Sequence, residues 1–189
     1  MSRGRLLALA LAFEAVAFLL ALAIAGASGT PLRGSARFSL AGVAAGTVSG
    51  AALAGLVLAA MRTRWRPLIE LGEVAREITR RFFRYATFVD LLVISALAGM
   101  AEEALFRGAI QATVSQAWGP AAGITAGALV FGLAHALTFG YAVAAGLMGM
   151  AMGILFEATG DLAAPILSHA VYDLVVLLAL RRNLASQST

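Results

Sequence analysis

The chain of 189 residues contains no cysteine and no lysine, and only 13% of its residues are charged. Without cysteine there is no disulfide framework, no thiolate nucleophile and no thiolate metal ligand. The low charge argues against an ordinary soluble domain, in which about a quarter of the residues are charged. Hydrophobic residues make up 61% of the chain, which is more than one buried core requires. We therefore expect an integral membrane protein.

Six apolar runs approach or reach the roughly 20 residues that a helix needs to cross about 30 Å of hydrocarbon. They are residues 6–25, 38–61, 86–101, 121–137, 141–156 and 162–180. The sequence therefore predicts an all-α, polytopic bundle of about six transmembrane helices. We expect two N-terminal helices with a basic segment (residues 1–85), a four-helix membrane core that carries any chemistry (residues 86–182) and a short polar tail (residues 183–189).

The first apolar run has two interpretations, because Arg3 and Arg5 before it and the small residues at 25–27 imitate a secretory signal peptide. The run is too long for a typical signal peptide and contains Glu14, so we expect a retained span. Glu14 lies in the middle of that span. Two explanations stay open for Glu14. It is a carboxylic acid kept protonated or hydrogen-bonded between helices, or it has an active role.

Most arginines gather before the first span, between the second and third spans, and after the sixth span, whereas Arg33 and Arg37 lie in a loop between the first two spans. All three groups fall on one side of a six-span protein, which the positive-inside rule makes cytoplasmic. We expect both termini on that side and a location in a bacterial or archaeal plasma membrane. The charge borders spans and forms no patch on a soluble domain, so we expect membrane lipids as partners and no nucleic acid. The oligomeric state stays open.

Two segments outside the core have recognisable patterns. Residues 66–84 alternate charged and apolar side chains with helical spacing, which predicts an amphipathic helix at the cytoplasmic interface, with a solvated linker as the alternative. The second span carries glycines suited to close helix packing. They are Gly42, Gly46, Gly50 and Gly55.

An ionisable side chain at bilayer depth costs at least about 2.5–3.5 kcal/mol, so it normally faces a cavity or a partner. Asp90 lies near Arg84 at a span end, and Glu157 and Asp161 flank the turn at Gly160. We expect Asp90 to pair with Arg84, and Glu157 and Asp161 to lie in water. The remaining polar residues of the core have no such explanation.

The stretch AEEALFRG contains two adjacent glutamates within an apolar segment. Glu103 and Arg107 are four residues apart with the acid first, the favourable order for a helical ion pair. Glu102 projects about 100° away around the helix. The predicted pair therefore leaves Glu102 available as a general base.

Both histidines of the chain lie within predicted spans. His135 follows Phe131 by four residues, and His169 precedes Asp173 by four, so each pair shares a helix face. In one consistent chemistry, Glu102 and His135 activate a water molecule, and His169 with Asp173 stabilises the developing oxyanion. A zinc site of the two histidines and a carboxylate is the other. The sequence lacks the motifs of serine, zinc and aspartyl intramembrane proteases.

These motifs resemble those of the CPBP membrane proteins, a family that includes CAAX prenyl endopeptidases and bacterial homologues tied to bacteriocin self-immunity. The matching stretches are EEALFR, FGLAH and HAVYD, which begin at Glu102, Phe131 and His169. The resemblance implies a helical membrane core that hydrolyses a peptide bond of a membrane-associated or lipidated substrate, prenylated or not. It also implies an alternative, a non-catalytic protein on the same scaffold that serves in immunity, as a chaperone or as a complex subunit. A proton-coupled transporter has less support, because the chain has no internal repeat.

The resemblance also implies roles for single residues. Glu102 and His135 would activate the attacking water, and His169 with Asp173 would stabilise the oxyanion. Glu103 would assist, tied to Arg107, and Phe131 would orient its histidine. This mechanism needs no metal, although zinc stays possible.

The third motif departs from the family at position 173, where the prenyl endopeptidases place asparagine and this chain has Asp173. An ionised aspartate only accepts hydrogen bonds and so cannot donate to an oxyanion. Three roles stay open for Asp173: a protonated donor, a carboxylate that orients His169, or a cation ligand.

Overall fold

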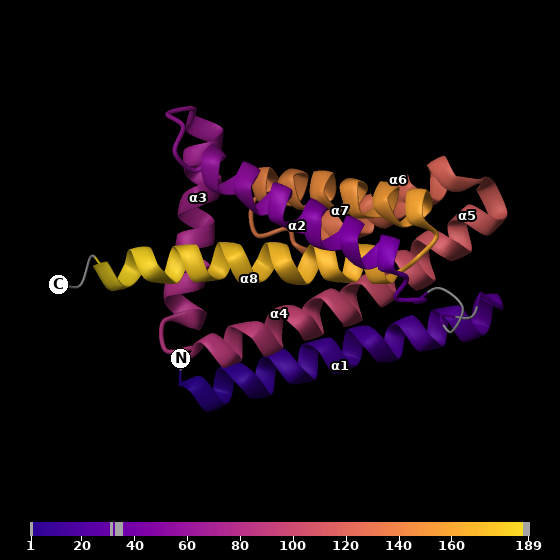
Figure 1. Ribbon diagram of the computed structural model, residues 1–189, viewed down its shortest axis with the longest axis horizontal. Helices are drawn as coiled ribbons and strands as arrows, with labels where there is room; N and C mark the ends of the chain where they lie inside the picture. Colours follow the sequence, from indigo (N-terminus) through magenta and orange to yellow (C-terminus); the bar gives the residue numbers. More distant parts are fainter. Residues whose placement is uncertain (1, 31, 33–35, 187–189) are drawn as a thin grey trace.

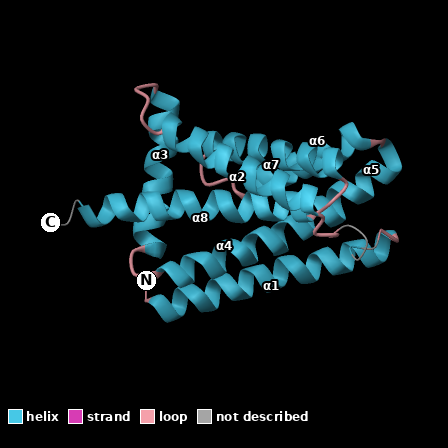
Figure 2. Cartoon of the chain, viewed as in Figure 1, coloured by secondary structure: helices cyan, strands magenta, loops and turns pink. Residues whose placement is uncertain are grey.

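The computed structural model describes residues 2–30, 32 and 36–186, with the side chains of residues 184–186 left aside. The described residues form helices joined by short turns, with no β-strand among them (Figure 2), which confirms the predicted all-α class. The α-helices are α1 (Arg3–Ser28), α2 (Leu40–Ala60), α3 (Arg66–Ile78), α4 (Phe88–Glu103), α5 (Ala112–Trp118), α6 (Pro120–Ala134), α7 (Phe139–Thr159) and α8 (Ala163–Ser186), and the π-helical segments are η2 (Thr79–Phe83) and η3 (Ala104–Gln111). Of the predicted polar tail, residues 187–189 lie outside the described residues.

Six helical rods account for the six predicted spans. Four helices are long and apolar enough to cross a membrane: α1, α2, α7 and residues Ala163–Asn183 of α8. The helix α6 is apolar but shorter. The sixth rod consists of α4, η3 and α5, which follow one another without a break from Phe88 to Trp118. The helix that contains the third apolar run therefore continues well beyond Glu102 and Glu103.

The helix α3 lies across the end of the bundle where both chain termini lie (Figure 1). Its charged residues Glu70, Glu73 and Glu77 are exposed, whereas Gly72 is buried. This two-sided pattern confirms the predicted amphipathic helix. The following segment η2 leads from α3 into α4.

Packing of α2 against α8 depends on the absence of side chains on α2. A Cβ atom on Gly46 would lie 2.4 Å from the carbonyl oxygen of Ala164, and one on Gly50 would lie 2.4 Å from that of Ser168. Such close backbone approach is typical of membrane helix pairs. Gly55 does not belong to this face, because a Cβ atom there would meet nothing within 4 Å.

The helix α4 begins with a capping box between Thr87 and Asp90. The Asp90 carboxylate also accepts hydrogen bonds from Nε and Nη2 of Arg3 at 2.7 and 2.9 Å. The expected partner, Arg84, lies over the ring of Tyr85 instead. The pair of Arg3 and Asp90 fixes the start of α1 beside the start of α4.

The expectation that Asp161 reaches water is wrong. Asp161 is 1% exposed and lies between α7 and α8, outside the spans. Its carboxylate accepts hydrogen bonds from Ser39 Oγ at 2.7 Å and from the backbone N–H groups of Arg37, Ser39 and Ala163 at 2.9 to 3.0 Å. Burial acts to raise the pKa of Asp161, but these hydrogen bonds outweigh it and hold the pKa at about 2. Asp161 therefore ties the start of α2 to the turn before α8.

Candidate active site

The two adjacent glutamates lie at the point where α4 passes into the π-helical segment η3. Every residue from 101 to 109 is buried. A π-helical turn inside an α-helix is rare and frequently occurs at functional sites. The charges of AEEALFRG therefore face the interior of the bundle, and none of them faces lipid.

The predicted ion pair of Glu103 and Arg107 is confirmed. Arg107 Nε lies 3.1 Å from Glu103 Oε2, and both side chains are fully buried. Arg107 Nη1 donates to Glu103 Oε1 at 3.3 Å, and Nη2 donates to the carbonyl oxygen of Gly149 at 2.8 Å. The guanidinium carbon lies 4.8 Å from the centre of the Phe131 ring. The pair thus joins η3 to α6 and α7.

Glu103 has a second partner, which the sequence did not predict. His169 Nδ1 lies 2.8 Å from Glu103 Oε1. On the other side of the ring, His169 Nε2 lies 3.5 Å from Asp173 Oδ2. One carboxylate has lone pairs enough for both an arginine and a histidine. His169 is therefore held between two acids on α4 and α8.

Glu102 faces the other histidine. Glu102 Oε2 lies 3.7 Å from His135 Nε2. His135 Nδ1 lies 2.9 Å from the carbonyl oxygen of Phe131, and the two rings stack with their centroids 4.3 Å apart. Because the carbonyl only accepts, Nδ1 carries the hydrogen of this bond, and Nε2 of the neutral ring is left to accept a proton. The rings of Phe131 and His135 therefore lie on the same side, as their spacing predicted.

Two features of the helices bring Glu102 and His135 together. The helix that carries Glu102 runs on to Trp118, and α6 ends at Ala134, so His135 lies just past a helix end.

Four of the acids and histidines line one pocket of about 370 Å³. Glu102, His135, His169 and Asp173 all contribute to its wall. Glu103 and Arg107 do not. The seven predicted site residues thus divide into five that line the pocket, Phe131 among them, and a buried pair that supports them from behind.

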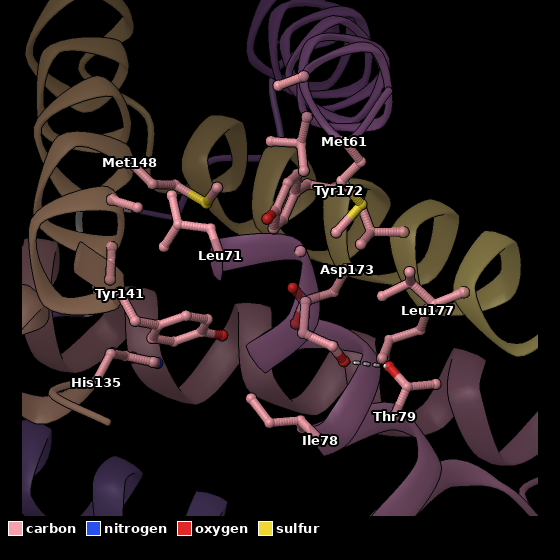
Figure 3. Close-up of a pocket in the computed structure, with 18 of the residues that line it drawn as sticks. Met61, Leu71, Ile78, Thr79, His135, Tyr141, Met148, Tyr172, Asp173 and Leu177 are labelled. Atoms are coloured by element: carbon pink, nitrogen blue, oxygen red, sulfur yellow. Dashed lines mark hydrogen bonds between the residues drawn. The ribbon is translucent and has the colours of Figure 1, made fainter. Parts of the chain in front are cut away.

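Much of the remaining wall is apolar and comes from α2, α3, α7 and α8, and Leu71 and Ile78 of α3 are among the lining residues (Figure 3). The sequence did not predict that the amphipathic helix borders the site. It also missed Tyr141 and Tyr172, whose hydroxyl groups extend into the pocket (Figure 3). Tyr172 stands beside Asp173 in the third motif, which is the only signal for either tyrosine.

The donor set does not fit the alternative of a zinc site. Zinc needs about three protein ligands arranged around it. Among the described residues, no three histidine or acidic side chains come together in such an arrangement. Both ring nitrogens of His169 are already directed at carboxylates.

One stretch of the chain matches a known family. Residues 84–175, just under half of the sequence, match a family model described as "Type II CAAX prenyl endopeptidase Rce1-like". No curated protein and no solved structure matches the chain. The matched residues include all seven predicted site residues and leave out the helices α1, α2 and α3.

Proposed function

Residues 84–175 belong to the type II CAAX prenyl endopeptidase Rce1-like family, and on this basis we propose that the chain is an intramembrane endopeptidase. One observation carries the proposal beyond family membership. A carboxylate from α4, a histidine from the turn after α6 and a histidine from α8 line a single pocket, with Glu102 and His135 3.7 Å apart. At this spacing, one water molecule beside the pair, in the pocket, would be within hydrogen-bond reach of both side chains.

In the proposed reaction Glu102 and neutral His135 hold the attacking water. Glu102 takes one proton from this water as the new oxygen–carbon bond forms at the scissile carbonyl. The carbonyl electron pair moves onto oxygen and gives a tetrahedral oxyanion. When the carbon–nitrogen bond breaks, Glu102 returns the proton to the leaving amine.

His169 would stabilise the oxyanion by donating a hydrogen bond. When both its nitrogens are protonated, Nδ1 donates to Glu103 and Nε2 is free to turn from Asp173 to the oxyanion. The two neighbouring carboxylates balance the charge of this imidazolium. In this scheme Asp173 orients His169, Glu103 positions His169 from behind, and Arg107 holds Glu103.

The reaction as proposed requires no metal. The expected result with a chelator is unchanged turnover, whereas loss that zinc restores would contradict the metal-independent mechanism. The substrate would be a membrane-associated or lipidated peptide or protein, since the site opens between membrane helices and an amphipathic helix.

Turnover of a mixed peptide library by the purified protein in detergent tests the proposal. We expect activity in wild type and its loss in Glu102→Ala and in His135→Ala. If wild type and Glu102→Ala behave alike while deletion of the protein still has a cellular phenotype, a non-catalytic role is supported instead.

A further inference from the structure

The helix α1 lies outside the matched residues 84–175, yet it carries one buried acid, Glu14. Glu14 is 8% exposed, and its Oε2 atom has no hydrogen-bond partner among the described residues. The mechanism proposed above does not use it. Burial of a carboxyl group without a hydrogen-bond partner costs free energy. Within a membrane, such a group normally has a function or interacts with a neighbouring polar group.

Two polar links fix the register of α1 against the helix that carries Glu102. Arg3 binds Asp90 at one end, and Ser28 accepts a hydrogen bond from Thr113 at the other, at 2.9 Å. Within these pairs the two residue numbers differ by 87 and by 85. Applied to Glu14, the same offsets reach residues 99 to 101, directly beside Glu102.

The apolar packing of α1 gives the same placement. Below Glu14, Leu6 packs in a cluster with Leu91 and Ile94. Above it, Ala17 packs in a cluster with Ala101 and Ala104. All of these α1 residues lie on one buried helix face together with Glu14.

Glu102 also has a carboxylate oxygen without a hydrogen-bond partner in the described part of the chain. Its Oε2 is buried and accepts no hydrogen bond among the described residues. Glu14 lies close enough to Glu102, His169 and Asp173 for electrostatic interactions with each of them. Two buried carboxyl oxygens on neighbouring helices thus lack partners at the same level of the bundle.

We propose that Glu14 is a positioning residue for Glu102: its protonated carboxyl group donates a hydrogen bond, directly or through one water molecule, to the buried Oε2 of Glu102. This inference rests on the proposed function for its catalytic consequence. This hydrogen bond fixes the orientation of the Glu102 carboxylate, whose Oε2 also lies 3.7 Å from His135 Nε2. The helix α1 is then part of the catalytic unit, although it lies outside the family match.

Two substitutions separate this role from packing. Glu14→Gln keeps the size of the side chain and an N–H donor, so we expect kcat close to that of wild type. Glu14→Leu removes the donor, so we expect kcat to fall about 10²-fold, with little change in KM. The control Leu6→Ala loosens the same face of α1 elsewhere, and should lower the unfolding temperature without this loss of kcat.

Three kinetic results would overturn the proposal. They are an unchanged kcat in Glu14→Leu, a fall no larger than in Leu6→Ala at equal folded fraction, and a Glu14→Gln variant as inactive as Glu14→Leu.

Infrared spectroscopy tests the hydrogen bond without any substrate, and so remains decisive if the proposed function fails. We expect a C=O stretching band of a protonated carboxyl group that disappears in Glu14→Gln and shifts in Glu102→Ala. A spectrum in which neither substitution changes such a band would contradict the inference even if the protein proves to be a protease. Absence of turnover in wild type with both band changes present would contradict the proposed function alone.

Discussion

Nδ1 of His169 lies 2.8 Å from Oε1 of Glu103, so the first and third sequence motifs meet through the glutamate that also binds Arg107. The adjacent glutamates therefore have different surroundings. Glu103 is held between Arg107 and His169 behind the pocket, whereas Glu102 is in the pocket wall.

Removal of Glu103 should destabilise the fold strongly. Glu103→Ala leaves Arg107 buried without its counter-charge, and breaking a buried pair in this way costs about 3–5 kcal/mol. The measurement is the free energy of unfolding in detergent. The matched control is Glu77→Ala, which breaks the exposed pair of Glu77 with Arg80 and should cost about 0–1 kcal/mol. Equal effects of the two substitutions would show that the buried pair is not a structural centre.

Substitution at position 173 tests the departure from the family pattern. Asp173→Asn removes the carboxylate that lies 3.5 Å from His169 Nε2 and supplies an amide N–H that is able to donate to the oxyanion. Because the proposed mechanism uses the Asp173 carboxylate to orient His169 and to balance its charge, we expect a lower kcat in Asp173→Asn and in Asp173→Ala. A kcat in Asp173→Asn equal to or higher than that of wild type would instead show that the residue at position 173 donates to the oxyanion.

Close packing between α2 and α8 predicts an asymmetry between two glycines. Gly50→Ala places a Cβ atom against the backbone of α8, and overpacking of this kind costs about 1–3 kcal/mol. Gly55→Ala, in open space on the same helix, should leave stability unchanged or slightly raised. Thermal unfolding of both variants checks this, and a loss in Gly55→Ala equal to that in Gly50→Ala would contradict the packing.

Asp161 should make stability depend on acid pH. Its pKa of about 2 in the folded protein is lower than the ordinary value of 3.8, so its contribution is full above about pH 4 and is lost as the pH falls through 2. We expect Asp161→Asn to be less stable than wild type at pH 7, and the difference to shrink between pH 4 and pH 2. A difference that does not change with pH would show that the ionised form of Asp161 contributes nothing.

The sequence predicted features that depend on neighbours along one helix. The ion pair of Glu103 with Arg107 and the shared face of Phe131 and His135 both follow from a spacing of four residues, and both are present. The apolar runs likewise predicted the bundle, because span length follows from membrane thickness.

Contacts between distant helices could not be predicted in this way. Nothing in the spacing shows that His169 binds Glu103, or that Arg3 binds Asp90 in place of Arg84. Asp161 was expected in water because it follows a turn, yet the start of α2 folds over it. Such contacts are set by how the helices pack, and the local pattern does not determine that packing.

The most direct test of the proposed mechanism is the rate of peptide hydrolysis by purified wild type, Glu102→Gln and His135→Ala, with folding of each checked by its unfolding temperature. Removal of a general base costs about 10²–10⁴-fold in rate. We predict a loss of at least the lower value in both variants, with their folding intact. A Glu102→Gln variant that cleaves peptide as fast as wild type would contradict the assignment of Glu102 as the base that activates water.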